Sequence, residues 1–250
     1  MKVSLVNITP QAEEHIVEVA RVSSLRKNKR ENYEGLIRYL INHKHWSPFE
    51  HSFATFEIET SKAIGIQLIR HRSFTFQEFS QRYQDVSMME EMFEGIELRK
   101  QAKDNRQSST EIFDDKVQVE GGYISFKELI SNHLNNAKKL YSMMLNEGVA
   151  RECARMVLPL NTKTVIHMTG SIRSWIHFLQ LRDDEHAQKE IQLIAKEIRG
   201  FLEVELPNVF KALQNESNDI RERLQEGQST HHTDKLSIKT DSGGDFCAND

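Results

Sequence analysis

Cysteine is scarce in this sequence, because its 250 residues contain only Cys153 and Cys247. Two thiols cannot form a disulfide framework or a four-thiolate zinc site. No run of 18 or more apolar residues occurs, so no membrane-spanning helix is predicted. The N-terminal residues also lack the apolar stretch and small-residue cleavage site of a secretory signal. These absences favour a cytoplasmic protein.

Glycine motifs, net charge and metal-binding patterns are also lacking. The 11 glycines include no G-x-G-x-x-G after a predicted strand and no P-loop, which excludes those two phosphate sites. Lys and Arg total 33 against 37 Asp and Glu, and a formal charge of −4 argues against nucleic-acid binding by bulk charge. His43 and His45 have chelating spacing, but no acid or cysteine stands at ligand spacing beside them, so no metal is predicted.

Hydrophobic periodicity predicts a single domain of α/β class and α+β type, a small antiparallel sheet packed with many helices, without a Rossmann fold. The helix after the first strand is expected to start with Thr9 as N-cap and Pro10 in its first turn. Alternation predicts strands over 2–8, 52–60 and 165–169. The helical period predicts helices over 10–22, 36–43, 61–70, 123–146, 149–158, 171–181 and 187–206.

Three polar segments are expected to lack helices and strands. Residues 24–32 are interpreted as a basic connector and residues 99–122 as a long loop. Of the last 25 residues five are apolar, too few to bury a core. We therefore divide the chain into a catalytic domain over 1–215 and a polar, disordered tail over 216–250.

The segment from Arg70 to Tyr83, with the sequence RHRSFTFQEFSQRY, is the most unusual part of the chain. Arginine stays charged and grips phosphate with two parallel hydrogen bonds, so several arginines beside hydroxyl and amide groups suit a nucleotide. A basic surface strand with buried aromatic residues would have the same composition. The residue types alone leave both interpretations open.

Cationic residues recur at a spacing of four further along the chain, which places each pair on one face of a predicted helix. Ordinary surface ion pairing with nearby acids is the alternative interpretation of Arg151 and Arg182, and it suits Arg151. It explains Arg155 less well, because the apolar residues 156–158 follow it directly. The pairs are Arg151 and Arg155, Arg173 and His177, and Arg182 and His186.

Arg70-His71-Arg72, followed after seven residues by Ser80, resembles the signature of the flavin-dependent thymidylate synthases. The longer form, R-H-R-x-x-S-x-N-E-x-S-x-R-Y, departs at two positions, where Thr75 replaces Ser and Gln77 replaces Asn. Thr75 keeps the hydroxyl group and Gln77 keeps the amide group of the signature residues. The arginines of the signature, Arg70, Arg72 and Arg82, are all present. The likeness continues through 43–51, 151–159, 173–178 and 181–188, and covers roughly residues 1–215.

The resemblance implies reductive methylation of dUMP to dTMP, with methylenetetrahydrofolate as carbon donor and FAD reduced by NADPH as hydride source. It also implies a homotetramer with active sites between subunits. The implied FAD contacts are His45, Ser47, Arg70, His71, Arg72, Glu78, Ser171, Ile172, Arg173 and His177. The implied dUMP contacts are Gln67, Leu68, Ile69, Arg70, Glu78, Phe79, Ser80, Gln81, Arg82, Arg155 and Arg182.

Within that set Arg182 is the expected catalytic residue. A fixed cation beside the pyrimidine favours ionisation of the imide nitrogen and pushes electron density to C5. Arg82, Arg155 and Ser80 are expected to position the phosphate. No thiol is required, and Cys153 is expected to be a small buried residue on a different helix face from its neighbouring arginines.

Two other functions remain open from the sequence. The first is a nucleotide- or RNA-binding module that uses residues 70–83 as a stacking platform. The charge of −4 and the lack of an RRM, KH or OB pattern weigh against it, and a bound flavin would exclude it. The second is a flavoprotein of this scaffold with another acceptor, given Thr75 and Gln77, which turnover of dUMP would exclude.

Overall fold

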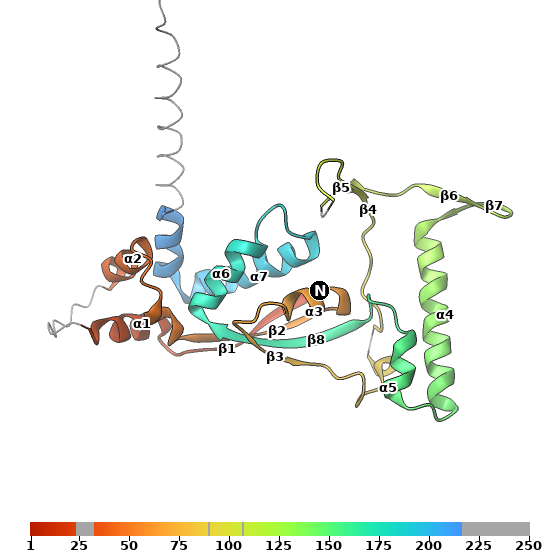
Figure 1. Ribbon diagram of the computed structural model, residues 1–250, viewed down its shortest axis with the longest axis horizontal. Coiled ribbons are helices and arrows are strands. Elements are labelled where there is room, and N and C mark those ends of the chain that lie inside the picture. Colours follow the sequence, from red (N-terminus) through yellow and green to blue (C-terminus); the bar gives the residue numbers. More distant parts are fainter. Residues whose placement is uncertain (24–32, 90, 107, 217–250) are drawn as a thin grey trace, which may run out of the picture.

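The computed structural model describes residues 1–23, 33–89, 91–106 and 108–216. A four-stranded antiparallel sheet with the order β1-β2-β8-β3 lies at its centre (Figure 1). Helices α6 (Ile172–Arg182) and α7 (Lys189–Glu205) lie over one face of this sheet. The strands are β1 (Lys2–Ile8), β2 (Phe53–Ser61), β3 (Thr75–Glu78) and β8 (Lys163–Ser171). The predicted α+β class is confirmed.

Strands β2 and β8 pair along their whole length, from Phe53 opposite Ser171 to Ser61 opposite Lys163. Alternate residues of both strands are buried beneath the helices, as period-2 patterning requires for a sheet covered on one face. The other face carries polar pairs, among them Glu57 and His167 at 2.9 Å. The strands predicted from this alternation are confirmed, and β8 is longer than expected.

Each of these two strands runs directly into a helix that begins with a serine cap. Ser61 accepts from the Ile64 N–H at the start of α3 (Lys62–Leu68), and Ser171 accepts from the Ser174 N–H at the start of α6. Because β2 and β8 are antiparallel, the two helices start at opposite ends of the sheet and run toward each other. The residues that follow α3 therefore meet the end of α6.

One end of the sheet is covered by α1 (Ala12–Arg21), α2 (Glu34–Asn42) and the short helix η1 (Ser47–Glu50). The predicted cap of α1 is wrong. Thr9 instead accepts a hydrogen bond from the Phe53 N–H at 2.9 Å, which ties it to β2, and the helix begins after Gln11. Buried Glu13 of α1 accepts from the main chain at 208–209 and so fixes the C-terminal helical residues 207–216.

A second body of structure extends from the other end of the sheet (Figure 1). The segment predicted as a loop over 99–122 forms two hairpins. Their short strands are mostly exposed on both faces, so they lack the hydrophobic alternation that marks a strand. Helix α4 (Phe126–Asn146) follows and packs through Tyr141 onto a small separate cluster. The hairpin strands are β4 (Arg99–Gln101), β5 (Ser109–Ile112), β6 (Lys116–Val119) and β7 (Gly122–Ser125).

The helix predicted over 149–158 is two shorter pieces, α5 (Arg151–Ala154) and the 3-10 helix η3 (Arg155–Val157). A further 3-10 helix, η2 (Val86–Met88), lies after β3. No helix of the described residues is long and apolar enough to cross a membrane. The predictions for residues 24–32 and for the tail beyond residue 216 fall outside the described residues.

Candidate active site

The arginine-rich segment leaves α3 and turns beneath α6. Phe74 anchors it, because its ring lies 4.6 Å from the Trp175 ring and covers Gly170. A Cβ atom at Gly170 would lie 2.4 Å from the Phe74 ring, so glycine is required there. With this aromatic residue buried, Arg70 and Arg72 are held at the surface and His71 faces α6.

His71 and Arg182 meet at the junction of the two strand–helix units. The Arg182 Nε–H donates to His71 Nε2 at 2.9 Å. Burial lowers the pKa of His71 to about 4, with the nearby charges of Arg182 and His177 acting in the same direction. His71 is therefore neutral near pH 7, with an acceptor at Nε2 and its proton on Nδ1.

The charge of Arg182 is not neutralised by its surroundings. Burial lowers the pKa of Arg182, and the positive charge of Arg70 lowers it further. Across the described ranges no carboxylate forms an ion pair with Arg182. The adjacent carboxylate, that of Asp183, pairs with Arg199 at 2.5 Å instead. A half-buried cation without a counter-ion is suited to a ligand that carries or develops negative charge.

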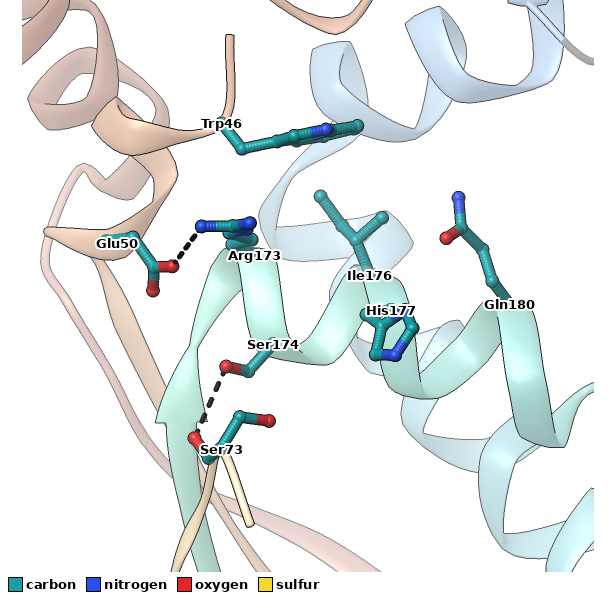
Figure 2. A pocket seen from close by; sticks show the side chains of 8 residues that line it. All are labelled: Trp46, Glu50, Ser73, Arg173, Ser174, Ile176, His177 and Gln180. Carbon is teal, nitrogen blue, oxygen red and sulfur yellow. Dashed lines mark hydrogen bonds and ion pairs between the residues drawn. The ribbon is translucent and has the colours of Figure 1, made fainter. Parts of the chain in front are cut away.

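A cavity of about 450 Å³ lies next to this cluster, between η1 and α6 (Figure 2). We call it the Trp46 cavity. Trp46 lies across it from Ile176, and Arg173 bonds Glu50 at 2.8 Å on one side. His177 lines the cavity and is close enough to His71 to lower its pKa. The cavity and the Arg182 cluster are therefore parts of one site.

Two of the ten predicted FAD contacts line this cavity. Arg173 and His177 line it, and Ser171 donates to Glu50 at 2.5 Å from beneath. Ser47 is exposed at the start of η1, and exposed His45 has its ring 5.8 Å from that of Tyr39. The Ile172 side chain is fully buried in the core, so only its main chain can contact a ligand.

The predicted dUMP contacts fall into two groups. The first, the α3–α6 group, consists of Gln67, Arg70 and Arg182, and the side-chain amide of Gln67 donates to Gln188 at 2.6 Å. The second, the β3–α5 group, consists of Ser80, Arg82 and Arg155, which follow β3 or α5. Within the described part of the chain no hydrogen bond or ion pair joins the two groups.

Most of the remaining predicted dUMP contacts are buried or bonded within the protein. Glu78 bonds Lys62 and Thr164, each at 2.8 Å, so it lies on the sheet below α3. Leu68 is fully buried in the core. Gln81 is buried as well, and Phe79 packs against the small cluster around Tyr141. Ile69 is exposed beside the first group.

Cys153 does not occupy the predicted environment. It is exposed rather than buried, and the neighbouring Ala154 is the residue of α5 that packs into the cluster around Tyr141. Cys247 lies outside the described residues. Within the described ranges no three His, Cys, Asp or Glu side chains come together as a metal site.

Several residues that line the Trp46 cavity were not predicted from the sequence. A usable signal was present on α6, since Ile176 and Gln180 lie three and seven positions after Arg173 and share its face. Glu50 gave no comparable signal, because only the folded chain brings it to Arg173. The residues not selected are Trp46, Glu50, Ser73, Ser174, Ile176 and Gln180.

Comparison with known proteins finds relatives that share one family. Residues 4–208 match the family described as thymidylate synthase complementing protein. The chain is 40% identical over 203 residues to a probable flavin-dependent thymidylate synthase of Paramecium bursaria Chlorella virus 1, covering 81% of this chain and 90% of the relative. It is 40% identical over 199 residues to the flavin-dependent thymidylate synthase of Synechocystis sp., covering 80% and 88%. A Thermus thermophilus relative of the same name is 34% identical over 226 residues, covering 90% and 77%.

The fold and site thus define an enzyme that handles a nucleotide without a Rossmann fold. The chain belongs to the flavin-dependent thymidylate synthase family. The family and enzyme class predicted from the motif at 70–83 are confirmed. The alternative of an RNA-binding module gains no support from these relatives.

Proposed function

We propose that this protein forms dTMP from dUMP, with methylenetetrahydrofolate as carbon donor, FAD as the bound cofactor and NADPH as its reductant. The carrying observation is the pairing of Arg182 with neutral His71, which leaves a fixed positive charge beside the Trp46 cavity. Such a charge stabilises an anion that develops on the pyrimidine. The family of the relatives supports the same reaction.

The residues around the Trp46 cavity fit a flavin. Trp46 and Ile176 provide flat and apolar surface, while Arg173 and His177 provide donors at its edge. Arg72 is exposed nearby and suits a phosphate of the same cofactor. When bound, FAD supplies the hydride that completes the methyl group. His45, Ser47, Glu78 and the 171–173 stretch remain proposed contacts from the motif.

In this proposal the α3–α6 group receives the uracil ring. Arg182 favours the ionised imide, which increases electron density at C5. His71 holds the guanidinium in place through its Nε2 lone pair. Gln67 and Arg70 lie at the same junction and complete the ring contacts. Ser80, Arg82 and Arg155 of the β3–α5 group bind the nucleotide phosphate.

The two groups share no hydrogen bond or ion pair within the described residues of one copy, which agrees with sites assembled from more than one copy of the chain. One copy would supply the α3–α6 group and another the β3–α5 group. This arrangement agrees with the homotetramer that the motif resemblance implies. We propose a catalytic domain over 1–215, supported by the family match over 4–208. The tail over 216–250 and the cytoplasmic location stay predictions.

The test is an omission assay on the purified protein. We expect a flavin spectrum, and dTMP formation only when dUMP, methylenetetrahydrofolate and NADPH are all present with FAD. NADPH oxidation and dTMP formation would be followed together, so that a different acceptor is detected. A yellow protein that oxidises NADPH but makes no dTMP would contradict the proposed acceptor. A protein without flavin would contradict the proposed cofactor.

A further inference from the structure

A second groove, of about 570 Å³, lies between the β4–β5 hairpin and the start of α7. We call it the hairpin groove. It shares no lining residue with the Trp46 cavity. Its lining is polar and charged, so it suits a charged ligand rather than an apolar one.

Most charged side chains of the hairpin groove are already paired. Arg99 bonds Glu97 at 2.9 Å and Glu190 at 2.5 Å, and Lys189 bonds Glu97 at 2.7 Å. Glu111 is paired in the same way with Lys100 across the hairpin, at 2.9 Å. These ion pairs hold the hairpin against α7 and leave no net charge for a ligand.

Two cations of the groove are left without such a partner. Arg106, at the tip of the hairpin, and Lys196, on α7, are exposed and form no ion pair within the described part of the chain. Glu185, 4.0 Å from His186, is the opposing carboxylate of the lining. The groove therefore carries an excess of one positive charge, which favours an anionic ligand.

The positive side chains are spread along the groove. Lys196 lies seven positions after Lys189 on α7, about 10 Å further along the helix axis than the ion pair of Lys189 with Glu97, and Arg106 comes from the hairpin side of the groove. A single phosphate requires donors that converge on one point. A chain of carboxylates spaced along a flexible backbone suits donors arranged in this way.

The hairpin groove also adjoins the proposed uracil site. Gln188 lines the groove and accepts the hydrogen bond from Gln67 of the α3–α6 group at 2.6 Å. The loop from Arg182 to Gln188 is fixed at both ends, by Asp183 with Arg199 and by Gln192 bonding the Ala187 carbonyl at 2.5 Å. An extended ligand that reaches Gln67 can continue past Gln188 into the groove.

We propose that the hairpin groove binds the glutamate tail of the folate co-substrate, with its carboxylates facing Arg106 and Lys196. This inference rests on the proposed function, because it takes folate as the carbon donor. The hairpin groove would thus bind the tail of a folate whose reacting end lies at the proposed uracil site. Folates with several γ-linked glutamates should then bind more tightly than folates with one.

The test compares methylenetetrahydrofolate carrying one and three glutamates as substrates, and the matching pteroylglutamates as ligands in calorimetric titrations. We expect the triglutamate to bind about fivefold more tightly, equivalent to ~1 kcal/mol. The double variant Arg106→Ala/Lys196→Ala should lose this preference, with kcat and the KM for dUMP unchanged. Glu185→Gln should increase it, because one opposing charge is removed.

The matched control is Arg38→Ala/Lys211→Ala, which removes one arginine and one lysine from exposed positions outside the groove. It should keep the preference for the triglutamate. Equal affinity for both tails in the parent, or an unchanged preference in Arg106→Ala/Lys196→Ala, would overturn the inference. A higher KM for NADPH instead of folate in that variant would also overturn it.

The results distinguish an error in the proposed tail binding from an error in the proposed reaction. Normal dTMP formation, with a folate affinity that does not depend on the number of glutamates, contradicts only the binding of the tail in the hairpin groove. Absence of both dTMP formation and pteroylglutamate binding contradicts the proposed function and the groove together. Calorimetric binding that depends on tail length, without turnover, supports the groove and contradicts the proposed reaction.

Discussion

Arg182 donates its Nε–H to the Nε2 atom of a neutral His71 at 2.9 Å, although arginine in a protein interior ordinarily pairs with a carboxylate. A carboxylate would fix the guanidinium but would also neutralise it. The imidazole fixes it and leaves its charge available. This relationship accounts for a cation that is both ordered and uncompensated at the proposed uracil site.

Replacing Arg182 with Ala should reduce dTMP formation about a hundredfold or more, the cost of losing one well-placed donor to a developing anion. Flavin content should stay close to that of the parent. Arg182→Lys should have intermediate activity, because it keeps a charge but not the Nε–H that His71 accepts. The rates would be measured at saturating dUMP. Near-normal turnover of Arg182→Ala would show that another residue activates the pyrimidine.

The lowered pKa of His71 has a consequence for stability. The unfolded chain titrates this histidine near 6.5 and the folded chain at about 4. Between those values the unfolded state binds more protons, so the contribution of His71 to the free energy of unfolding is full above pH 6.5 and is lost as the pH falls toward 4.

Thermal melts of the ligand-free protein between about pH 4 and 7 would test this linkage, and the window follows from the two pKa values. In His71→Asn the melting temperature should fall less steeply with decreasing pH than in the parent. His167→Asn is the matched control, since His167 lies on the opposite face of the sheet. Parallel pH profiles of parent and His71→Asn would contradict a neutral His71.

Arg72→Ala should release the flavin and leave the fold intact. Arg72 is exposed and forms no ion pair within the described residues, so its loss removes no internal contact. A hydrogen bond to a charged group contributes about 1.5–3 kcal/mol, which corresponds to FAD affinity weaker by roughly tenfold or more. Flavin absorbance after gel filtration and the far-ultraviolet circular dichroism would be compared with Arg38→Ala. Full occupancy in Arg72→Ala would remove it from the FAD contacts.

Composite sites predict complementation between inactive variants. Arg182→Ala damages the α3–α6 group and Arg155→Ala the β3–α5 group. If one site takes a group from each of two copies, mixed assemblies contain some intact sites, about a quarter after random exchange. The activity of refolded mixtures would be compared with that of each variant alone. No recovery, or a fully active monomer in solution scattering, would contradict assembly between copies.

A cysteine nucleophile is not part of this account. Cys153 is exposed, contrary to the expectation from sequence, so its burial cannot exclude it. The proposed charge on Arg182 makes C5 reactive without a thiolate adding to the ring. The double variant Cys153→Ala/Cys247→Ser should therefore keep dTMP formation within a few-fold of the parent. A variant that binds FAD and dUMP but forms no dTMP would show that a thiol is required.

The elements that the sequence predicts well are those with one buried face. The alternation of Ala54, Phe56 and Ile58 identified β2, and the stripe of α7 identified that helix, because burial of one face imposes a period on the sequence. The hairpins over 99–125 bury little apolar surface and therefore show no such period. The position of the β4–β5 hairpin against α7 depends on ion pairs such as Arg99 with Glu190, which local sequence cannot identify.

The candidate site was predicted in part for similar reasons. The motif named Arg182 and His71, yet their contact joins residues 111 positions apart and follows from the antiparallel pairing of β2 and β8. The ion pair of Glu50 with Arg173 has the same origin. Helix periodicity could have added Ile176 and Gln180.

The most direct test of the central claim is the stoichiometry of a single turnover. The holoenzyme with its FAD reduced would be mixed without oxygen with dUMP and methylenetetrahydrofolate, and flavin oxidation and dTMP would be measured in the same samples. We expect one dTMP for each FAD oxidised in the parent, and both processes slowed together in Arg182→Ala. Flavin oxidation without dTMP, or equal rates in the two proteins, would contradict it.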